Sequence, residues 1–66
     1  MSYEIGILAG KIWNYLNLNG EVNSLKLKLD LEINRIQLFL ALGWLLKEDK
    51  INLEKKNEEY FISLKQ

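Results

Sequence analysis

The chain has 66 residues, with nine Lys or Arg balanced by nine Asp or Glu, and it contains no Cys, His or Pro. A chain of this length is expected to form a single domain, residues 1–66, with one core. Its net charge of zero gives no bulk attraction to nucleic acid or to anionic membranes. The missing residue types exclude zinc fingers, disulfide scaffolds, thiol enzymes and His-based acid–base chemistry.

Residues 3–18 are predicted to form a helix with one buried stripe. Ile5, Leu8, Ile12 and Leu16 recur at intervals of three and four residues, which is typical of an amphipathic helix. The pair Asn19-Gly20 follows, and a residue that tolerates the left-handed conformation commonly closes a helix. The first helix is therefore expected to end there.

No targeting or membrane segment is expected. The apolar N-terminal stretch lacks a preceding basic region, which argues against a secretory signal. The uncharged run from Ile36 to Leu46 has eleven residues, well below the ~20 that a membrane-spanning helix needs. We expect a cytoplasmic protein with no membrane partner.

The sequence pattern of segment 25–33 is consistent with either a strand or a helix. Its apolar and charged residues alternate, which by itself predicts a strand. Asn23 and Ser24 are residues that favour a helix N-cap, and Leu27 and Leu31 form an i,i+4 apolar pair. We predict a short helix over 24–30, preceded by a very short strand or extended link over 21–23.

The third predicted helix is apolar on every side. Asn34, three residues before Gln37, predicts a capping box at its start. One stripe of four residues is enough to close the core: Leu38, Ala41, Leu42 and Leu45. The remaining apolar positions lie on the outside, and a 66-residue domain cannot cover its own helix completely.

The C-terminal third predicts a β-hairpin. Ile51 and Leu53 alternate with polar residues, residues 56–58 provide a turn, and alternation resumes after them. Asp49 tolerates a left-handed conformation and is expected to end the third helix.

This order of elements, and several stretches of sequence, resemble a family of small stand-alone bacterial winged helix-turn-helix proteins. The most specific stretch runs from Leu40 to Leu45 and is followed by Lys50-Ile51; segments 10–17 and 19–22 add to the resemblance. The resemblance implies an α+β fold of three helices with a C-terminal β-hairpin wing. It also implies a homodimer that lacks most DNA-binding residues of ordinary winged helices. Such turns often have Gly where this chain has Glu32 and Asp49.

The first functional hypothesis is a homodimeric protein–protein interaction module joined through the third helix. The expected interface residues share the outer side of that helix: Ile36, Phe39, Leu40, Gly43 and Trp44. Three of them could bury roughly 400–600 Å² per chain, which brings a two-fold dimer to about 1,000 Å². Gly43 would either let two backbones approach across the dimer or make room for the first helix within one chain.

The alternative is a DNA-binding regulator of transcription. Its candidate contacts are the polar residues around the third helix and the wing: Lys26, Lys28, Arg35, Gln37, Lys55 and Lys56. A recognition helix must offer hydrogen-bonding groups to base edges, and the outer side of this helix is apolar, so DNA is not favoured. An enzyme is not expected, because the serines have no His base, and no metal or cofactor is predicted.

Overall fold

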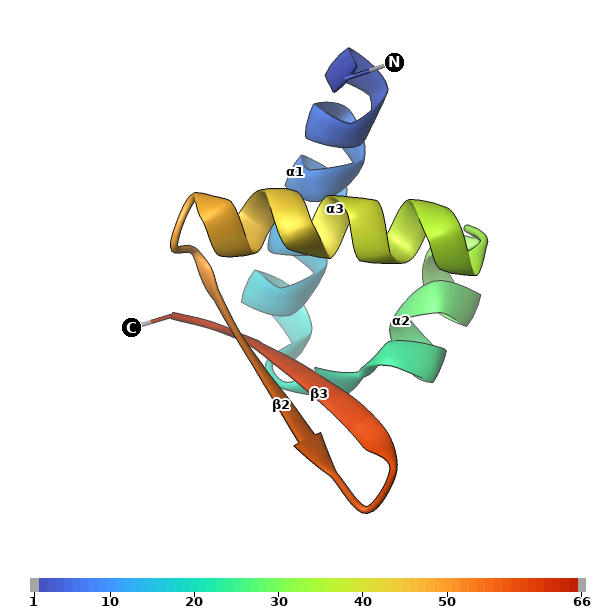
Figure 1. The fold of residues 1–66 in the computed structure, drawn as a ribbon, viewed down its shortest axis with the longest axis vertical. Helices are drawn as coiled ribbons and strands as arrows, with labels where there is room; N and C mark the ends of the chain where they lie inside the picture. Colours follow the sequence, from blue (N-terminus) through green and yellow to red (C-terminus); the bar gives the residue numbers. More distant parts are fainter. Residues whose placement is uncertain (1, 66) are drawn as a thin grey trace.

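The computed structural model describes residues 2–65 and has three helices and three strands in that part of the chain. These are α1 (Ser2–Asn19), β1 (Val22–Asn23), α2 (Ser24–Leu31), α3 (Arg35–Lys47), β2 (Ile51–Lys56) and β3 (Glu59–Leu64). Helix α3 crosses α1, α2 lies beside the start of α3, and the β2–β3 hairpin extends away from the end of α3 (Figure 1). This arrangement confirms the predicted α+β winged helix-turn-helix with a C-terminal wing.

One core joins all six elements. Helices α1 and α3 each contribute a stripe, whereas α2 and each of the three strands contribute one buried residue. The fully buried side chains include Ile12 from α1, Leu27 from α2 and Ile62 from β3, all 0% exposed. The buried cluster comprises Ala9, Ile12, Leu16, Val22, Leu27, Leu38, Ala41, Leu42, Leu45, Ile51 and Ile62.

The conflict over residues 25–33 is resolved in favour of a helix. The side chain of Asn23 accepts a hydrogen bond from the backbone N–H of Lys26 at 2.8 Å, which caps α2. Of the alternating leucines, Leu27 enters the core, whereas Leu25 and Leu29 are 62% and 61% exposed. A strand would have buried alternate residues together, and only helical spacing buries Leu27 while it leaves its neighbours outside.

Helix α3 begins at the predicted capping box. The backbone N–H of Gln37 donates to Asn34 Oδ1 at 2.8 Å, and the N–H of Asn34 donates to Gln37 Oε1 at 3.1 Å. Asp49 ends the helix in the left-handed region at φ 59°. The backbone N–H groups of Asp49 and Lys50 then donate to the carbonyls of Leu46 and Leu45, both at 3.0 Å.

The sheet is antiparallel with the order β1-β3-β2. Val22 of β1 pairs with Ile62, so the short strand adds to the outer side of the hairpin. The hairpin turns at Asn57 and Glu58, which both have positive φ, at 51° and 69°.

Within residues 2–65, no helix is long and apolar enough to cross a membrane.

Candidate interaction surface on the third helix

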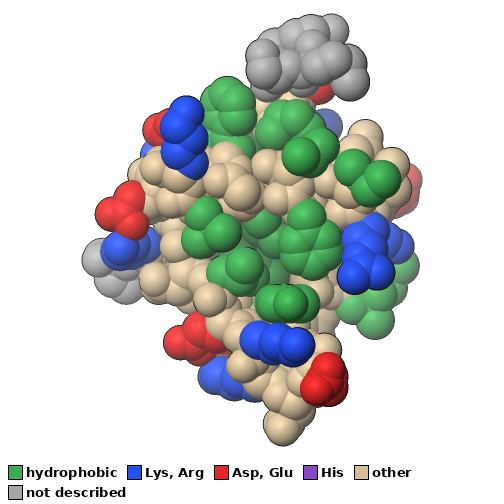
Figure 2. All heavy atoms as spheres, in the orientation of Figure 1, with side chains coloured by type: hydrophobic (Ala, Val, Ile, Leu, Met, Phe, Trp, Pro, Cys, Tyr) green, Lys and Arg blue, Asp and Glu red, His purple; other side chains and the backbone are tan. Residues whose placement is uncertain are grey.

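Helix α3 buries one side and leaves the opposite side uncovered. Its inner stripe is at most 3% exposed, whereas Ile36, Leu40 and Trp44 on the other side are 73%, 55% and 41% exposed. Phe39 is half-buried and Gly43 is exposed. We call the five residues predicted for the interface the α3 face: Ile36, Phe39, Leu40, Gly43 and Trp44. Hydrophobic side chains gather in the middle of this side of the molecule, over α3, with charged side chains around them (Figure 2).

Phe39 connects the α3 face to the wing. Its ring meets the ring of Tyr60 edge to face, with centroids 5.9 Å apart and planes at 78°. The guanidinium carbon of Arg35 lies 5.9 Å from the centroid of the Phe39 ring. Phe39 therefore contributes to packing within the chain as well as to the exposed face.

Trp44 is partly supported by α1. A Cβ atom at Gly6 would lie 3.6 Å from Cζ2 of the Trp44 indole, so the ring lies over this part of α1 at a distance that leaves room for a methyl group. Trp44 and Trp13 line a groove between α1 and the end of α3, together with Gly6 and Gly10. The apolar surface thus continues from α3 onto α1.

Gly43 does not make room for α1, so the intrachain alternative for this glycine is wrong. A Cβ atom built at Gly43 meets no heavy atom within 4 Å. At Gly6, by contrast, a Cβ atom would be in ordinary van der Waals contact with Trp44. Nothing within residues 2–65 therefore requires Gly43 to lack a side chain for packing.

Two exposed apolar residues belong with the α3 face but were not assigned to it. Leu46 is 43% exposed on α3, and Trp13 is 37% exposed beside Trp44 in the groove. The sequence signal for Trp13 was its spacing after Gly6 and Gly10, which puts all three on one side of α1. Leu46 carried no separate signal, because the third helix is apolar in every direction.

The residues proposed for nucleic-acid contact do not form one free basic surface. Three of the lysines lie in ion pairs with N···O distances of 3.2, 3.9 and 3.5 Å: Lys26 with Asp30, Lys55 with Glu58, and Lys56 with Glu54. Gln37 is occupied by the capping box. Lys28 and Arg35 line a hollow between α2, the start of α3 and the wing.

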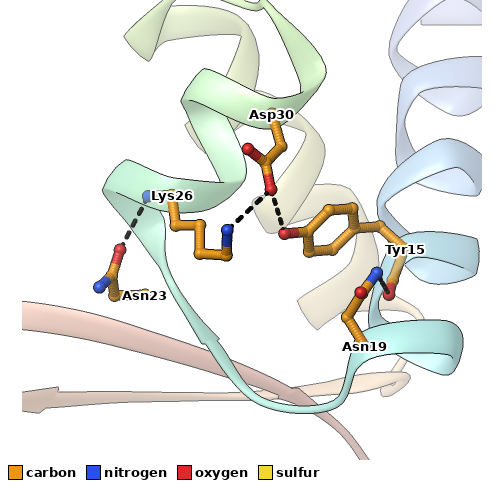
Figure 3. Close-up of polar contacts among 5 residues, drawn as sticks. All are labelled: Tyr15, Asn19, Asn23, Lys26 and Asp30. Carbon is orange, nitrogen blue, oxygen red and sulfur yellow. Dashed lines mark hydrogen bonds and ion pairs between the residues drawn. The ribbon is translucent and has the colours of Figure 1, made fainter.

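Lys26 takes part in a polar link between α1 and α2 (Figure 3). The hydroxyl of Tyr15 donates a hydrogen bond to Asp30 Oδ2, and the Lys26 ammonium lies 3.2 Å from the same oxygen. The Tyr15 hydrogen bond, followed by the Lys26 hydrogen bond, lowers the pKa of Asp30 from its ordinary value of 3.8. Hydrogen bonding to Asp30 in turn raises the pKa of both Tyr15 and Lys26.

The part of the chain that the structure describes has no group of three or more side chains arranged to hold a metal ion. No side-chain nitrogen or oxygen among these residues is buried without a hydrogen-bond partner. The chemistry available on the α3 face is therefore apolar contact.

Comparison with known proteins gives a family and a fold. A family model described as "Winged helix-turn-helix domain (DUF2582)" matches residues 1–64. The solution NMR structure of protein BT2368 from Bacteroides thetaiotaomicron is similar to this chain, with a TM-score of 0.83 and 32% sequence identity. The similarity covers 97% of this chain and 79% of the other. No protein with curated annotation matches the sequence.

Proposed function

The chain belongs to the DUF2582 family of winged helix-turn-helix domains, and from this premise we propose that it is a homodimeric protein–protein interaction module joined through the α3 face. The observation that carries the proposal is the exposure of Ile36 and Leu40, at 73% and 55%, on a helix whose inner stripe alone closes the core. Exposed apolar residues that adjoin one another mark interaction sites, whereas isolated ones are common on any surface.

A two-fold dimer suits this surface because each copy presents the same apolar residues to the other. Gly43 lies within the α3 face and has open space above it. Without a side chain there, two α3 helices can approach closely at this point. The same glycine costs stability inside a helix, so a role in a close contact gives a reason for its presence.

The exposed fractions define how far the interface must extend. Phe39 is half-buried and Trp44 is 41% exposed. These two rings can therefore bury less area in a dimer than two fully exposed aromatic side chains would. A specific interface buries about 800 Å² on each partner. We therefore extend the proposed interface to Leu46 and Trp13, which continue the apolar surface on either side of the α3 face.

A DNA-binding regulator is supported less well by the same surface. The apolar α3 face would leave the hydrogen-bonding groups of base edges unpaired, at a cost of about 1–3 kcal/mol for each group. The lysines of the wing already have carboxylate partners, at 3.9 and 3.5 Å.

Winged helix-turn-helix domains are typically binding or regulatory modules rather than enzymes. A cytoplasmic location stays a prediction.

The test is the oligomeric state in solution. We expect light scattering coupled to size-exclusion chromatography to give twice the monomer mass at micromolar concentration. Leu40→Lys should convert the dimer to a monomer, because it places a charge in the middle of the apolar contact.

The matched control is Leu18→Lys, since Leu18 is 83% exposed near the end of α1 and lies outside the proposed interface. This variant should remain a dimer. A monomeric wild-type protein, or equal effects of the two substitutions, would contradict the proposal.

A further inference from the structure

The hollow between α2, the start of α3 and the wing differs in character from the α3 face. It has a volume of about 310 Å³, near the lower end for a small-molecule site. Residues from all three elements line it: Ser24, Leu25, Lys28, Arg35, Leu38, Phe39, Glu58 and Tyr60. Its wall therefore combines basic side chains, hydroxyl groups and an apolar floor.

The hollow carries an excess of positive charge in a chain whose net charge is zero. Lys28 is half-buried and, within residues 2–65, its ammonium has no carboxylate partner. Arg35 contacts the ring of Phe39 and is likewise in no ion pair among these residues. Glu58 is the acidic residue of the wall, and Lys55 offsets its charge at 3.9 Å.

The polar and apolar parts of the wall lie next to one another. In the described part of the chain, neither the Ser24 hydroxyl nor the Tyr60 hydroxyl has a hydrogen-bond partner, so both are available to a ligand oxygen. Leu38 and the edge-to-face pair of Phe39 and Tyr60 supply the apolar surface. A ligand that fills this hollow should carry both an anionic head and an apolar body.

We propose that the hollow binds a small organic anion in which a carboxylate or phosphate group is attached to an apolar body. Arg35 would hold the head group through its planar pair of N–H donors, and Lys28 would add a second positive charge. The apolar body would lie on Phe39, Tyr60 and Leu38. This site goes beyond the proposed dimer and does not depend on it, although Phe39 contributes to both surfaces.

The charge of the wing favours a small anion over a nucleic acid. Its strands and turn carry three acidic residues against two lysines: Glu54, Glu58 and Glu59 against Lys55 and Lys56. An extended polyanion lying along the wing would meet all three carboxylates, whereas a small anion beside Lys28 and Arg35 meets Glu58 alone.

The experiment is an NMR titration of the isotope-labelled full chain with phenyl phosphate and, separately, with benzoate. These two probes distinguish a phosphate from a carboxylate head group on the same apolar body. Inorganic phosphate tests the head group alone, and benzyl alcohol tests the body alone. We expect saturable shifts in α2, the start of α3 and the wing with at least one aryl acid, and binding at least tenfold weaker for both control compounds.

Substitutions identify the site. Lys28→Gln and Arg35→Gln should each weaken the binding of the aryl acid about tenfold or more, because each removes a charge-assisted contact. Lys11→Gln removes an exposed charge on α1 and should leave the affinity unchanged. The Leu40→Lys variant should bind as the wild type does, which separates this proposal from the fate of the dimer.

Two results would overturn the proposal. One is a set of shifts that grow linearly with every anion and do not change in the Lys28 and Arg35 variants. The other is saturable binding of a duplex DNA at ~50 mM salt, where phosphate contacts are favoured, with no binding of either aryl acid. That result would indicate that Lys28 and Arg35 contact nucleic acid instead.

Discussion

The indole of Trp44 lies over Gly6 of α1, where a Cβ atom would be 3.6 Å from its Cζ2 atom, an ordinary packing distance. This contact joins the end of α3 to α1 outside the main core. It also divides Trp44 between two roles, because part of the ring is held within the chain while 41% of the residue remains exposed. Substitution of Trp44 should therefore change both folding and the proposed association, and Leu40 is the cleaner probe of that association.

Alanine should be tolerated in the folded monomer both at Gly6 of α1 and at Gly43 of α3. At Gly6 the new methyl group would be in ordinary contact with Trp44, and at Gly43 it would meet nothing in the chain. Both substitutions should raise the stability of the folded monomer by about 0.5–1 kcal/mol, since alanine favours a helix over glycine. Urea denaturation of each variant in a Leu40→Lys background measures this effect without a contribution from the proposed dimer.

In the wild-type background, Gly43→Ala should weaken the proposed dimer, because the methyl group would separate the two α3 helices at their proposed close contact. Lys11→Ala is the control, since Lys11 is exposed on α1 and does not line the groove of Trp13 and Trp44. Sedimentation equilibrium gives both dissociation constants. Equal constants for wild type and Gly43→Ala would place Gly43 outside any close contact.

Two neighbouring leucines of α3 test the assignment of its sides. Leu42 is 1% exposed and Leu40 is 55% exposed. Leu42→Ala should lower the free energy of unfolding by about 2–5 kcal/mol through the cavity it leaves. Leu40→Ala should change the free energy of unfolding of the monomer by less than about 1 kcal/mol. Similar losses in chemical denaturation would show that the two sides of α3 are assigned wrongly.

The fold was predictable because local signals and core spacing agreed at most positions. The capping box of Asn34 and Gln37, the left-handed Asp49 and the stripe ending at Leu45 all appear in the structure as expected. The segment 25–33 was ambiguous because alternation and helix capping compete there, and packing of Leu27 decided the outcome. Rules based only on neighbouring residues in the sequence do not predict that packing.

The candidate site was predictable only in outline. An apolar excess on the third helix indicated an uncovered face, and Ile36 and Leu40 are indeed well exposed. The contact of Trp44 with Gly6 depends on the crossing of two helices, which no sequence spacing specifies. The hollow at Lys28 and Arg35 likewise requires the wing to fold back toward α2.

A left-handed residue at the end of α2 should carry removable strain. Glu32 has φ 55°, and its backbone N–H donates to the carbonyl of Leu29 at 3.2 Å. Glycine adopts this conformation without the steric cost of a Cβ atom, so Glu32→Gly should stabilise the protein by about 1 kcal/mol. Glu21→Gly, outside the left-handed region, should not stabilise it. Thermal unfolding compares the two variants, and a loss of stability in Glu32→Gly would show that this turn is unstrained.

The hydrogen-bonded link between α1 and α2 should make the free energy of unfolding depend on pH in the acidic range. The Tyr15 hydrogen bond, followed by that of Lys26, lowers the pKa of Asp30 below 3.8 in the folded chain. A carboxylate with a lowered folded pKa stabilises the protein above its unfolded pKa, and this contribution is lost as the pH falls through the folded value. Carboxyl NMR titration of Asp30 should therefore show a midpoint that rises toward 3.8 in Tyr15→Phe, and rises less in Lys26→Gln. Because Phe keeps the ring and removes only the donor, an unchanged midpoint in Tyr15→Phe would mean that the hydroxyl does not hold Asp30 in solution.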